Sequence, residues 1–111
     1  PLDLFRQIAK CRIMSSVFKA LADPTRRNVL ALLRERPMSA GELAESFDVS
    51  KPTMSAHFNV LREAGLIDAS KHGKSIVYRL RMSVLEEALM GLAETVGLDL
   101  GARVEGKEEK A

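Results

Sequence analysis

The chain has 111 residues, enough for one domain with a modest hydrophobic core, and its 46% hydrophobic and 29% charged residues are typical of a globular protein. No apolar run reaches the ~18–20 residues of a membrane span, and no signal-peptide pattern opens the chain. The single cysteine, Cys11, excludes an internal disulfide framework. The composition therefore predicts a cytoplasmic protein rather than a membrane protein or a disulfide-rich secreted domain.

The first predicted elements are helices. Apolar residues recur at roughly helical intervals along residues 1–22, which predicts one long helix or two short ones. Asp23 then serves as an N-cap, and Pro24 occupies the first position of the next helix, where the missing N–H of proline costs nothing. This helix is expected to end near Arg34, because Pro37 blocks its continuation.

A helix-turn-helix pattern follows. Ser39 and Glu42 match a capping box, which predicts the start of a short helix that ends near Phe47. Ser50 is the N-cap of a second helix, and Gly65 is expected to end it in a left-handed conformation. Two helices joined by a tight turn, the second basic and capped by serine, are typical of a helix-turn-helix unit.

The second helix of this unit has two different faces. Met54, Phe58 and Leu61 recur at helical spacing and are expected to face a core. The residues left for the outside are short, polar or basic, namely Lys51, Thr53, Ser55, His57, Asn59 and Arg62. Short side chains allow a helix backbone to approach base edges and phosphates, so this face predicts a recognition helix for the DNA major groove.

The remaining elements complete a winged fold. Residues 67–71 and 75–80 favour β-strands joined across residues 72–74, and a hairpin at this place is a wing with basic residues at its tip. Residues 82–96 predict a last helix, and the polar residues 99–111 predict a disordered tail. The expected fold class is therefore mainly α with a small β-hairpin wing, a winged helix-turn-helix.

Charge is distributed unevenly along the chain, although the formal net charge is only +2. Residues 50–81 contain six basic and two acidic residues, whereas the rest of the chain contains eleven basic and thirteen acidic ones. A basic segment on an otherwise acidic body predicts a polyanionic partner such as nucleic acid.

Three stretches carry a resemblance to a known family: DPTRRNVLALL, MSAGELAESFDVSKPTMSAHFNVLREAGLI and KHGKSIVYRL. They resemble the ArsR/SmtB family of winged-helix repressors over roughly residues 14–96, and within it the autorepressor, SdpR-type subgroup. Members of this subgroup begin near the position of Met14. The resemblance therefore divides the chain into an N-terminal helical extension (1–13), a DNA-binding and dimerisation domain (14–98) and the tail (99–111).

The resemblance implies a homodimer, built from the first and last helices, that represses transcription by occupying an operator. An anti-repressor protein, membrane-bound in this subgroup or soluble, is the implied partner that relieves repression. The residue pattern agrees with a dimer, because a domain this small has few places to bury the apolar stripes of both helices. Pairing across a two-fold axis would place two recognition helices about one DNA turn apart, which predicts an inverted repeat in double-stranded DNA. The expected interface residues are Leu4, Phe5, Ile8, Val17, Leu85, Leu89, Leu92 and Val96.

The resemblance also assigns DNA contacts, since the matching positions of family members reach DNA. Base readout is expected from Lys51, Pro52, Ser55 and Ala56, and phosphate contacts chiefly from Thr53, His57, Asn59 and Arg62. In the wing, contacts to phosphates or the minor groove are expected from Lys71, His72, Lys74 and Arg79, although charged hairpin tips also occur for solubility alone. A structural role is the alternative for His57. For Arg26 and Arg27, structural ion pairs are as well supported as DNA contacts.

Metal sensing is not expected. Metal-sensing family members carry paired cysteines in the helix before the recognition helix, and the matching GELAESF has none. The last helix, SVLEEALMGLAETV, lacks the histidine and carboxylate ligands of the other common site. Two histidines and one cysteine cannot close a zinc or arsenic site within one subunit, so no metal and no cofactor are predicted.

The sequence leaves three alternatives to the interpretation as a constitutive repressor. Cys11, if it lies near the dimer axis, could oxidise to an intersubunit disulfide and make a redox-gated repressor, although a small apolar role is favoured. A ligand-gated repressor of the same fold is the second alternative. An adaptor that binds an acidic protein through the basic helix is the third. No phosphate-binding loop, nucleophile with a base or carboxylate pair indicates catalysis, so neither an enzyme nor a small-molecule substrate is predicted.

Overall fold

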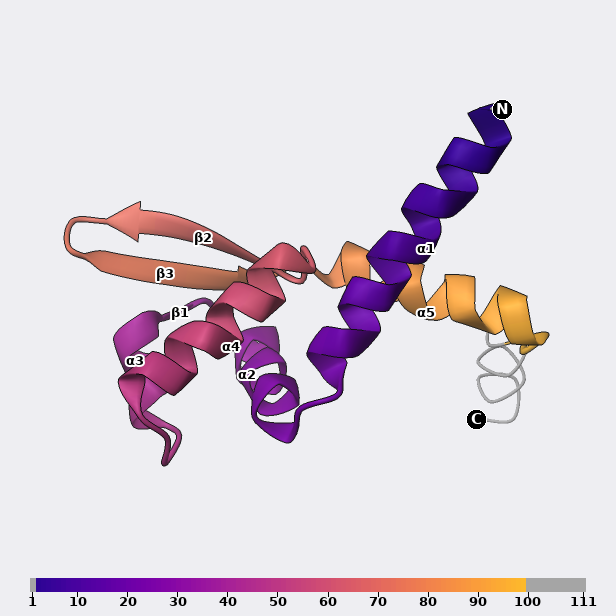
Figure 1. Ribbon diagram of the computed structural model, residues 1–111. Helices are drawn as coiled ribbons and strands as arrows, with labels where there is room; N and C mark the ends of the chain where they lie inside the picture. The colour runs from indigo at the N-terminus through magenta and orange to yellow at the C-terminus, as the bar shows by residue number, and fades with distance from the viewer. Residues whose placement is uncertain (1, 100–111) are drawn as a thin grey trace, which may run out of the picture.

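The computed structural model describes residues 2–99, apart from the side chains of residues 2, 3 and 5–11. The described residues form five α-helices and three short β-strands (Figure 1). The helices are α1 (Leu2–Leu21), α2 (Pro24–Glu35), α3 (Ala40–Glu45), α4 (Lys51–Glu63) and α5 (Met82–Val96). The strands are β1 (Met38–Ser39), β2 (Ile67–His72) and β3 (Ser75–Leu80). They form one antiparallel sheet in the order β1-β3-β2.

Helix ends follow largely from capping residues. The carboxylate of Asp23 accepts a hydrogen bond from the backbone N–H of Arg26 at 3.1 Å, which starts α2. α4 ends before Gly65, whose φ of 78° favours glycine, and the N–H of Leu66 donates to the carbonyl of Leu61 at 3.0 Å. The predicted caps at Asp23 and Gly65 are thus confirmed.

The N-terminal segment forms one long helix, so the long-helix alternative is confirmed and the two-helix alternative is wrong. The N-terminal half of α1 extends away from the rest of the molecule, while its C-terminal half packs across α5 (Figure 1). At this crossing, a Cβ on Gly91 of α5 would lie 2.9 Å from the sulfur of Met14 on α1. The absence of a side chain at residue 91 therefore allows the two helices to approach closely.

The predicted wing is confirmed, and the sheet contains one strand more than the sequence indicated. β2 and β3 pair up to His72 and Ser75, so a two-residue turn connects them and His72 belongs to the strand rather than to the turn. β1 adds to the other edge of β3, where Met38 lies opposite Tyr78. A strand of two residues is too short to show the alternating pattern by which strands are recognised in a sequence.

The core lies where α1, α2 and α4 meet the base of the sheet. Its largest fully buried side chains are Val17, Val29, Leu43, Met54, Leu61 and Leu66. The rings of Phe58 on α4 and Tyr78 on β3 pack with centroids 4.7 Å apart, which joins the second helix of the helix-turn-helix unit to the wing. Through these contacts α4 is held on the core along one whole side. The same burial raises the pKa of the Tyr78 phenol, with a smaller opposing effect of the Arg62 charge.

Two predictions concern parts of the chain that the structure does not describe. The predicted tail, residues 99–111, lies outside the described residues except for Asp99, and the side chain of Cys11 is not among those described. Among the helices of the described part, none is both long and apolar enough to cross a membrane.

Candidate nucleic-acid interface

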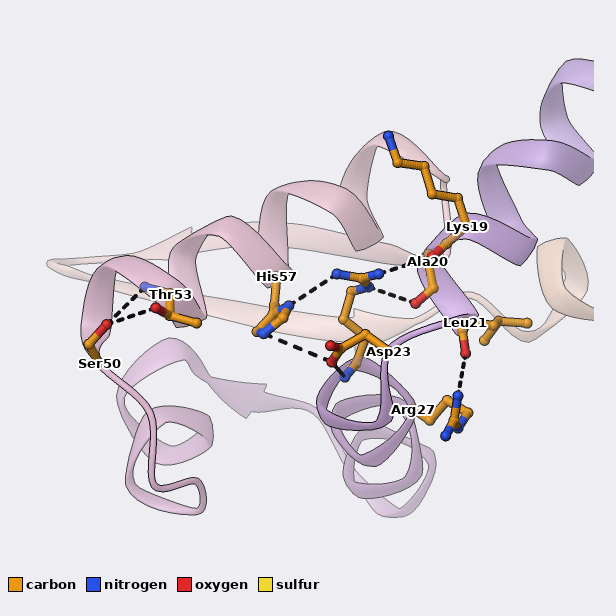
Figure 2. Close-up of polar contacts among 9 residues, drawn as sticks. Lys19, Ala20, Leu21, Asp23, Arg27, Ser50, Thr53 and His57 are labelled. Carbon is orange, nitrogen blue, oxygen red and sulfur yellow. Dashed lines mark hydrogen bonds and ion pairs between the residues drawn. The ribbon is translucent and has the colours of Figure 1, made fainter.

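α3, α4 and the turn between them form the predicted helix-turn-helix unit, and local hydrogen bonds fix where each helix begins. At α3 the capping box is complete. The N–H of Glu42 donates to Ser39 Oγ and the N–H of Ser39 donates to Glu42 Oε1, each at 3.1 Å. At α4 the N–H of Thr53 donates to Ser50 Oγ at 3.3 Å, and the Ser50 hydroxyl donates to that of Thr53 at 2.9 Å (Figure 2). The predicted caps at Ser39 and Ser50 are confirmed, and the unit has a defined geometry.

α4 presents one side to the core and the other to solvent. Met54, Phe58 and Leu61 are 1%, 4% and 0% exposed, so the predicted core side is confirmed. Seven of the eight residues predicted to contact DNA from this helix are exposed on its other side, and we call them the α4 face: Lys51, Pro52, Thr53, Ser55, Ala56, Asn59 and Arg62. The acidic residues of α4 are limited to Glu63 at its end. The α4 face therefore offers cations and hydrogen-bonding groups with almost no opposing charge.

The first turn of α4 is accessible from the side of α3. A groove between the two helices is lined on α3 by the small residues Ala40, Gly41 and Ala44, and on α4 by residues that include Lys51 and Ser55. Because the α3 residues that line this groove are small, the start of α4 is open to solvent on this side.

The wing adds basic groups beside the helix-turn-helix unit. All four predicted wing residues, Lys71, His72, Lys74 and Arg79, are exposed. The Nε2 atom of His72 lies 3.1 Å from the hydroxyl of Ser70, and at the base of the wing Arg81 Nε lies 3.6 Å from Asp68 Oδ2. The cations of the wing are thus exposed to a polyanionic partner.

His57 lies apart from the α4 face. Its side chain is only 14% exposed and points toward the junction of α1 and α2, where Nδ1 lies 3.2 Å from Arg26 Nη1 and Nε2 lies 3.9 Å from Asp23 Oδ2 (Figure 2). Partial desolvation raises the pKa of Asp23, but hydrogen bonds from the first turn of α2 and the electrostatic influence of the His57 ring and the Arg26 guanidinium outweigh it and hold this pKa below its ordinary value of 3.8. Of the two roles considered for this histidine, the geometry favours the structural one.

Arg26 and Arg27 bind the end of α1. Arg26 donates through Nε to the carbonyl of Ala20 at 2.7 Å and through Nη2 to that of Lys19 at 3.0 Å, and Arg27 Nη1 donates to the carbonyl of Leu21 at 2.7 Å. These carbonyls lie in the last turn of α1, where backbone acceptors have no partner within the helix. The structural alternative for both arginines is supported, through carbonyls rather than ion pairs. The one sequence signal for it is a pair of arginines in the first turn of a helix directly after another helix ends.

The predicted dimer residues fall into four groups. Those that are exposed are Leu4 on α1 and Leu89, Leu92 and Val96 on α5. Leu85 is half-buried, and the side chains of Phe5 and Ile8 are not among those described. The assignment of Val17 is wrong, because this side chain is fully buried in the core of its own chain and has no surface left for a second subunit.

Two exposed apolar residues extend this set beyond what the sequence analysis identified. Ile13 on α1 and Met90 on α5 are 52% and 61% exposed, and both line a hollow between the two helices. Met90 lies away from the apolar stripe of α5, whereas Ile13 stands four residues before Val17, at a helical spacing that the sequence analysis did not use. Leaving out Met82 at the first position of α5, we call the exposed apolar residues of the two helices the α1–α5 surface: Leu4, Ile13, Leu89, Met90, Leu92 and Val96.

No three His, Cys, Asp or Glu side chains lie close enough together to hold a metal ion within the described part of the chain. An exposed basic hairpin beside a capped helix-turn-helix unit defines the winged helix-turn-helix class of DNA-binding proteins. The fold and the exposed α4 face place this chain in that class.

Comparison with known proteins identifies the family. A family model described as a helix-turn-helix domain matches residues 21–68. The transcriptional repressor SdpR of Bacillus subtilis is 45% identical over 76 residues, which cover 68% of this chain and 84% of SdpR. An ArsR-like transcriptional regulator from Rhodococcus sp. RHA1 is 30% identical, with a TM-score of 0.71 over 93% of this chain and 96% of that one. The transcriptional repressor BigR from Xylella fastidiosa is 28% identical, with a TM-score of 0.59 over 85% of this chain and 92% of that one. The chain therefore belongs to the ArsR/SmtB family of DNA-binding transcriptional repressors.

Proposed function

We propose that this protein represses transcription as a homodimer bound to an inverted-repeat operator in double-stranded DNA. The observation that carries the proposal is the α4 face, an exposed and nearly acid-free surface on a helix whose opposite side is buried in the core. A recognition helix needs such a rigid support because side chains must meet base edges at fixed distances. Membership of the ArsR/SmtB family supports the same function.

The α4 face divides into base-reading and phosphate-binding groups in this proposal. Those proposed to reach base edges lie near the start of the helix and are Lys51, Pro52, Ser55 and Ala56. A lysine donates to guanine acceptors, a serine hydroxyl bonds to several base edges, and an alanine methyl contacts the thymine methyl. The proposed phosphate contacts are Thr53, Asn59 and Arg62 on α4 and Lys71, His72, Lys74 and Arg79 on the wing.

The dimer is proposed to form through the α1–α5 surface. Exposed apolar side chains on two adjacent helices favour coverage by a second copy, because water would otherwise solvate them. Residues 14–98 then constitute the DNA-binding and dimerisation domain, and the N-terminal extension (1–13) is represented in the structure by the part of α1 that begins at Leu2. A two-fold axis through this surface presents two copies of α4 to two half-sites.

Repression in this proposal is steric, since a dimer on the promoter excludes the polymerase, and it requires neither a bound metal nor a cofactor. An anti-repressor protein, membrane-bound or soluble, is proposed as the partner that relieves repression. The resemblance to the SdpR-type autorepressors supports this partner, and it suggests the DNA upstream of the protein's own gene as the first operator to test.

The experiment measures binding of the purified protein to that DNA at fixed salt, with unrelated DNA as competitor. Wild type is expected to prefer its own upstream DNA. The double variant Lys51→Ala/Ser55→Ala is expected to lose about tenfold or more in operator affinity, the size of one or two lost base contacts, with an unchanged melting temperature. The control Lys19→Ala/Ser83→Ala removes the same two residue types from exposed positions on α1 and α5 and is expected to bind as wild type does.

One result would contradict the assignment of base readout, and another would contradict the repressor function itself. Binding by the Lys51/Ser55 variant equal to wild type would remove the assignment of base readout. A wild-type protein that binds its upstream DNA no better than unrelated DNA, yet captures an acidic protein tightly, would favour the adaptor alternative over a repressor.

Additives test for a sensor of the same fold. Operator binding that is equal in chelator, in zinc, in reductant and in oxidant is expected of a repressor controlled by a partner protein. Loss of binding in zinc would contradict the prediction that no metal is sensed, and loss in oxidant would favour the redox alternative at Cys11.

A further inference from the structure

One guanidinium group, that of Arg26 on α2, bonds to two other helices. Its Nε and Nη2 atoms donate to the carbonyls of Ala20 and Lys19 at the end of α1, at 2.7 and 3.0 Å. Its Nη1 atom lies 3.2 Å from Nδ1 of His57 on α4. Figure 2 shows His57 pointing from α4 toward Asp23, at the junction of α1 and α2. This side chain therefore connects α1, α2 and the proposed recognition helix at a single point.

Hydrogen-bonding chemistry fixes how His57 takes part. Arginine only donates, so Nδ1 of His57 is the acceptor and the ring proton lies on Nε2. That nitrogen faces Oδ2 of Asp23 at 3.9 Å, and the same oxygen accepts from the N–H of Arg26 at 3.1 Å. Each hydrogen-bond donor in the cluster thus faces an acceptor on another element or turn. A shift of α4 would break the cluster.

We propose that His57 and Arg26 are positioning residues that set the orientation of α4 relative to α1, and that neither of them contacts DNA. This inference rests on the DNA-binding function proposed above. The side chain of His57 is 14% exposed, and the three guanidinium nitrogens of Arg26 are directed at protein acceptors, so a phosphate would have to displace these contacts. Because α1 is proposed to lie in the dimer interface, the cluster also sets the separation of the two recognition helices.

The chain provides a matched control and a conservative variant. Arg27 donates to the carbonyl of Leu21 and so attaches α2 to the end of α1 as Arg26 does, but in the described structure its hydrogen bond does not reach α4. Removing Arg27 therefore weakens the attachment of α1 without touching the recognition helix. At position 57, asparagine is the conservative choice because its amide oxygen can take the place of Nδ1 and accept from Arg26.

The experiment compares wild type, His57→Ala, His57→Asn and Arg27→Ala for affinity to the wild-type operator, affinity to unrelated DNA of the same length, and melting temperature. His57→Ala is expected to lose about tenfold in operator affinity, the cost of one mismatched base contact, with its affinity for unrelated DNA unchanged. His57→Asn and Arg27→Ala are expected to stay within about twofold of wild type on both DNAs.

A second measurement reports on orientation itself. Operators whose half-sites are moved together or apart by one base pair are expected to lose affinity for wild type more than for His57→Ala. A recognition helix that is no longer held against α1 tolerates other spacings, whereas a change in overall stability would not alter this preference.

Five results separate the possibilities. Equal loss on operator and unrelated DNA would make His57 a phosphate contact and overturn the proposal, as would a His57→Ala protein that discriminates DNAs and spacings as wild type does. Equal loss in Arg27→Ala would assign the effect to the attachment of α1 and would also overturn it. Arg26→Lys keeps the charge but cannot reach three acceptors, so it is expected to lose operator affinity as His57→Ala does. Full operator preference in Arg26→Lys would refute the proposal even if His57→Ala does not fold. A wild type that does not distinguish its operator would instead refute the proposed function.

Discussion

At the scale of single residues, Glu42 stabilises the helix-turn-helix unit through two contacts. Its Oε1 atom accepts the N–H of Ser39 at 3.1 Å, and its Oε2 atom accepts from Arg36 Nη2 at 2.9 Å. The hydrogen bond from Ser39, followed by that from Arg36, holds the pKa of Glu42 below its ordinary value of 4.5. A carboxyl group whose pKa is lowered on folding stabilises the folded state above the unfolded pKa. That stabilisation is lost as the pH falls through the folded-state pKa.

Glu42→Gln is therefore expected to lower the free energy of unfolding at neutral pH, and the difference from wild type should vanish in acid. Glutamine still accepts the capping hydrogen bond, so the variant isolates the charge. Urea denaturation at a series of pH values measures the difference. Glu45→Gln is the control, since Glu45 is exposed at the end of α3, where the helix dipole disfavours a negative charge, and this variant should lose no stability. A constant difference across the pH series would contradict the role of the Glu42 charge.

At the scale of elements, the crossing of α1 and α5 depends on a glycine. A Cβ at Gly91 would lie 2.9 Å from the sulfur of Met14, so a large side chain there must push the two helices apart or displace Met14. This crossing lies beside the α1–α5 surface, and its geometry therefore also determines how a second subunit would fit.

Gly91→Leu is expected to reduce the free energy of unfolding by about 1–3 kcal/mol through overpacking. Adding Met14→Ala should recover much of the loss, because it removes the atom that the new side chain meets. Denaturation at fixed protein concentration measures both variants. Gly41→Leu serves as the control, since the nearest atom to a Cβ at Gly41 is the Ser39 hydroxyl oxygen at 3.9 Å. Wild-type stability in Gly91→Leu would show that the crossing is not tightly packed.

At the scale of the whole molecule, the proposed dimer would combine the α1–α5 surface with two outward-facing recognition helices. The wing and the N-terminal half of α1 extend in opposite directions from the core (Figure 1). DNA binding and dimerisation are thus proposed for different sides of one small domain, and the cluster around Arg26 lies between them.

Leu89→Glu is expected to raise the dissociation constant of the dimer at least about tenfold, because a charge in an apolar interface loses its hydration. Operator affinity should fall with it, since two half-sites then bind separately. Sedimentation equilibrium measures the first effect. Ile76→Glu is the matched control, because Ile76 on the wing is 41% exposed, as is Leu89, and this variant should dimerise as wild type does. A wild-type monomer, or equal effects of the two variants, would contradict the proposed interface.

The sequence by itself determined those features that depend on neighbours within about one helical turn. The capping box of Ser39 and Glu42, the N-cap Ser50 and the buried stripe on α4 all follow from spacings of three or four residues, and the structure contains each of them. The last helix, residues 82–96, was predicted with its observed bounds for the same reason. These local patterns were sufficient to define the winged helix-turn-helix class.

Only the tertiary structure decided which surfaces meet. Helical spacing marks Val17 as apolar but does not distinguish the chain's own core from a partner, and packing places this residue in the core. The β1 strand exists because Met38 lies opposite Tyr78, and the cluster around Arg26 exists because His57, 31 residues further along the chain, lies against it. Such contacts depend on how whole elements pack, and no pattern of near neighbours in the sequence encodes their geometry.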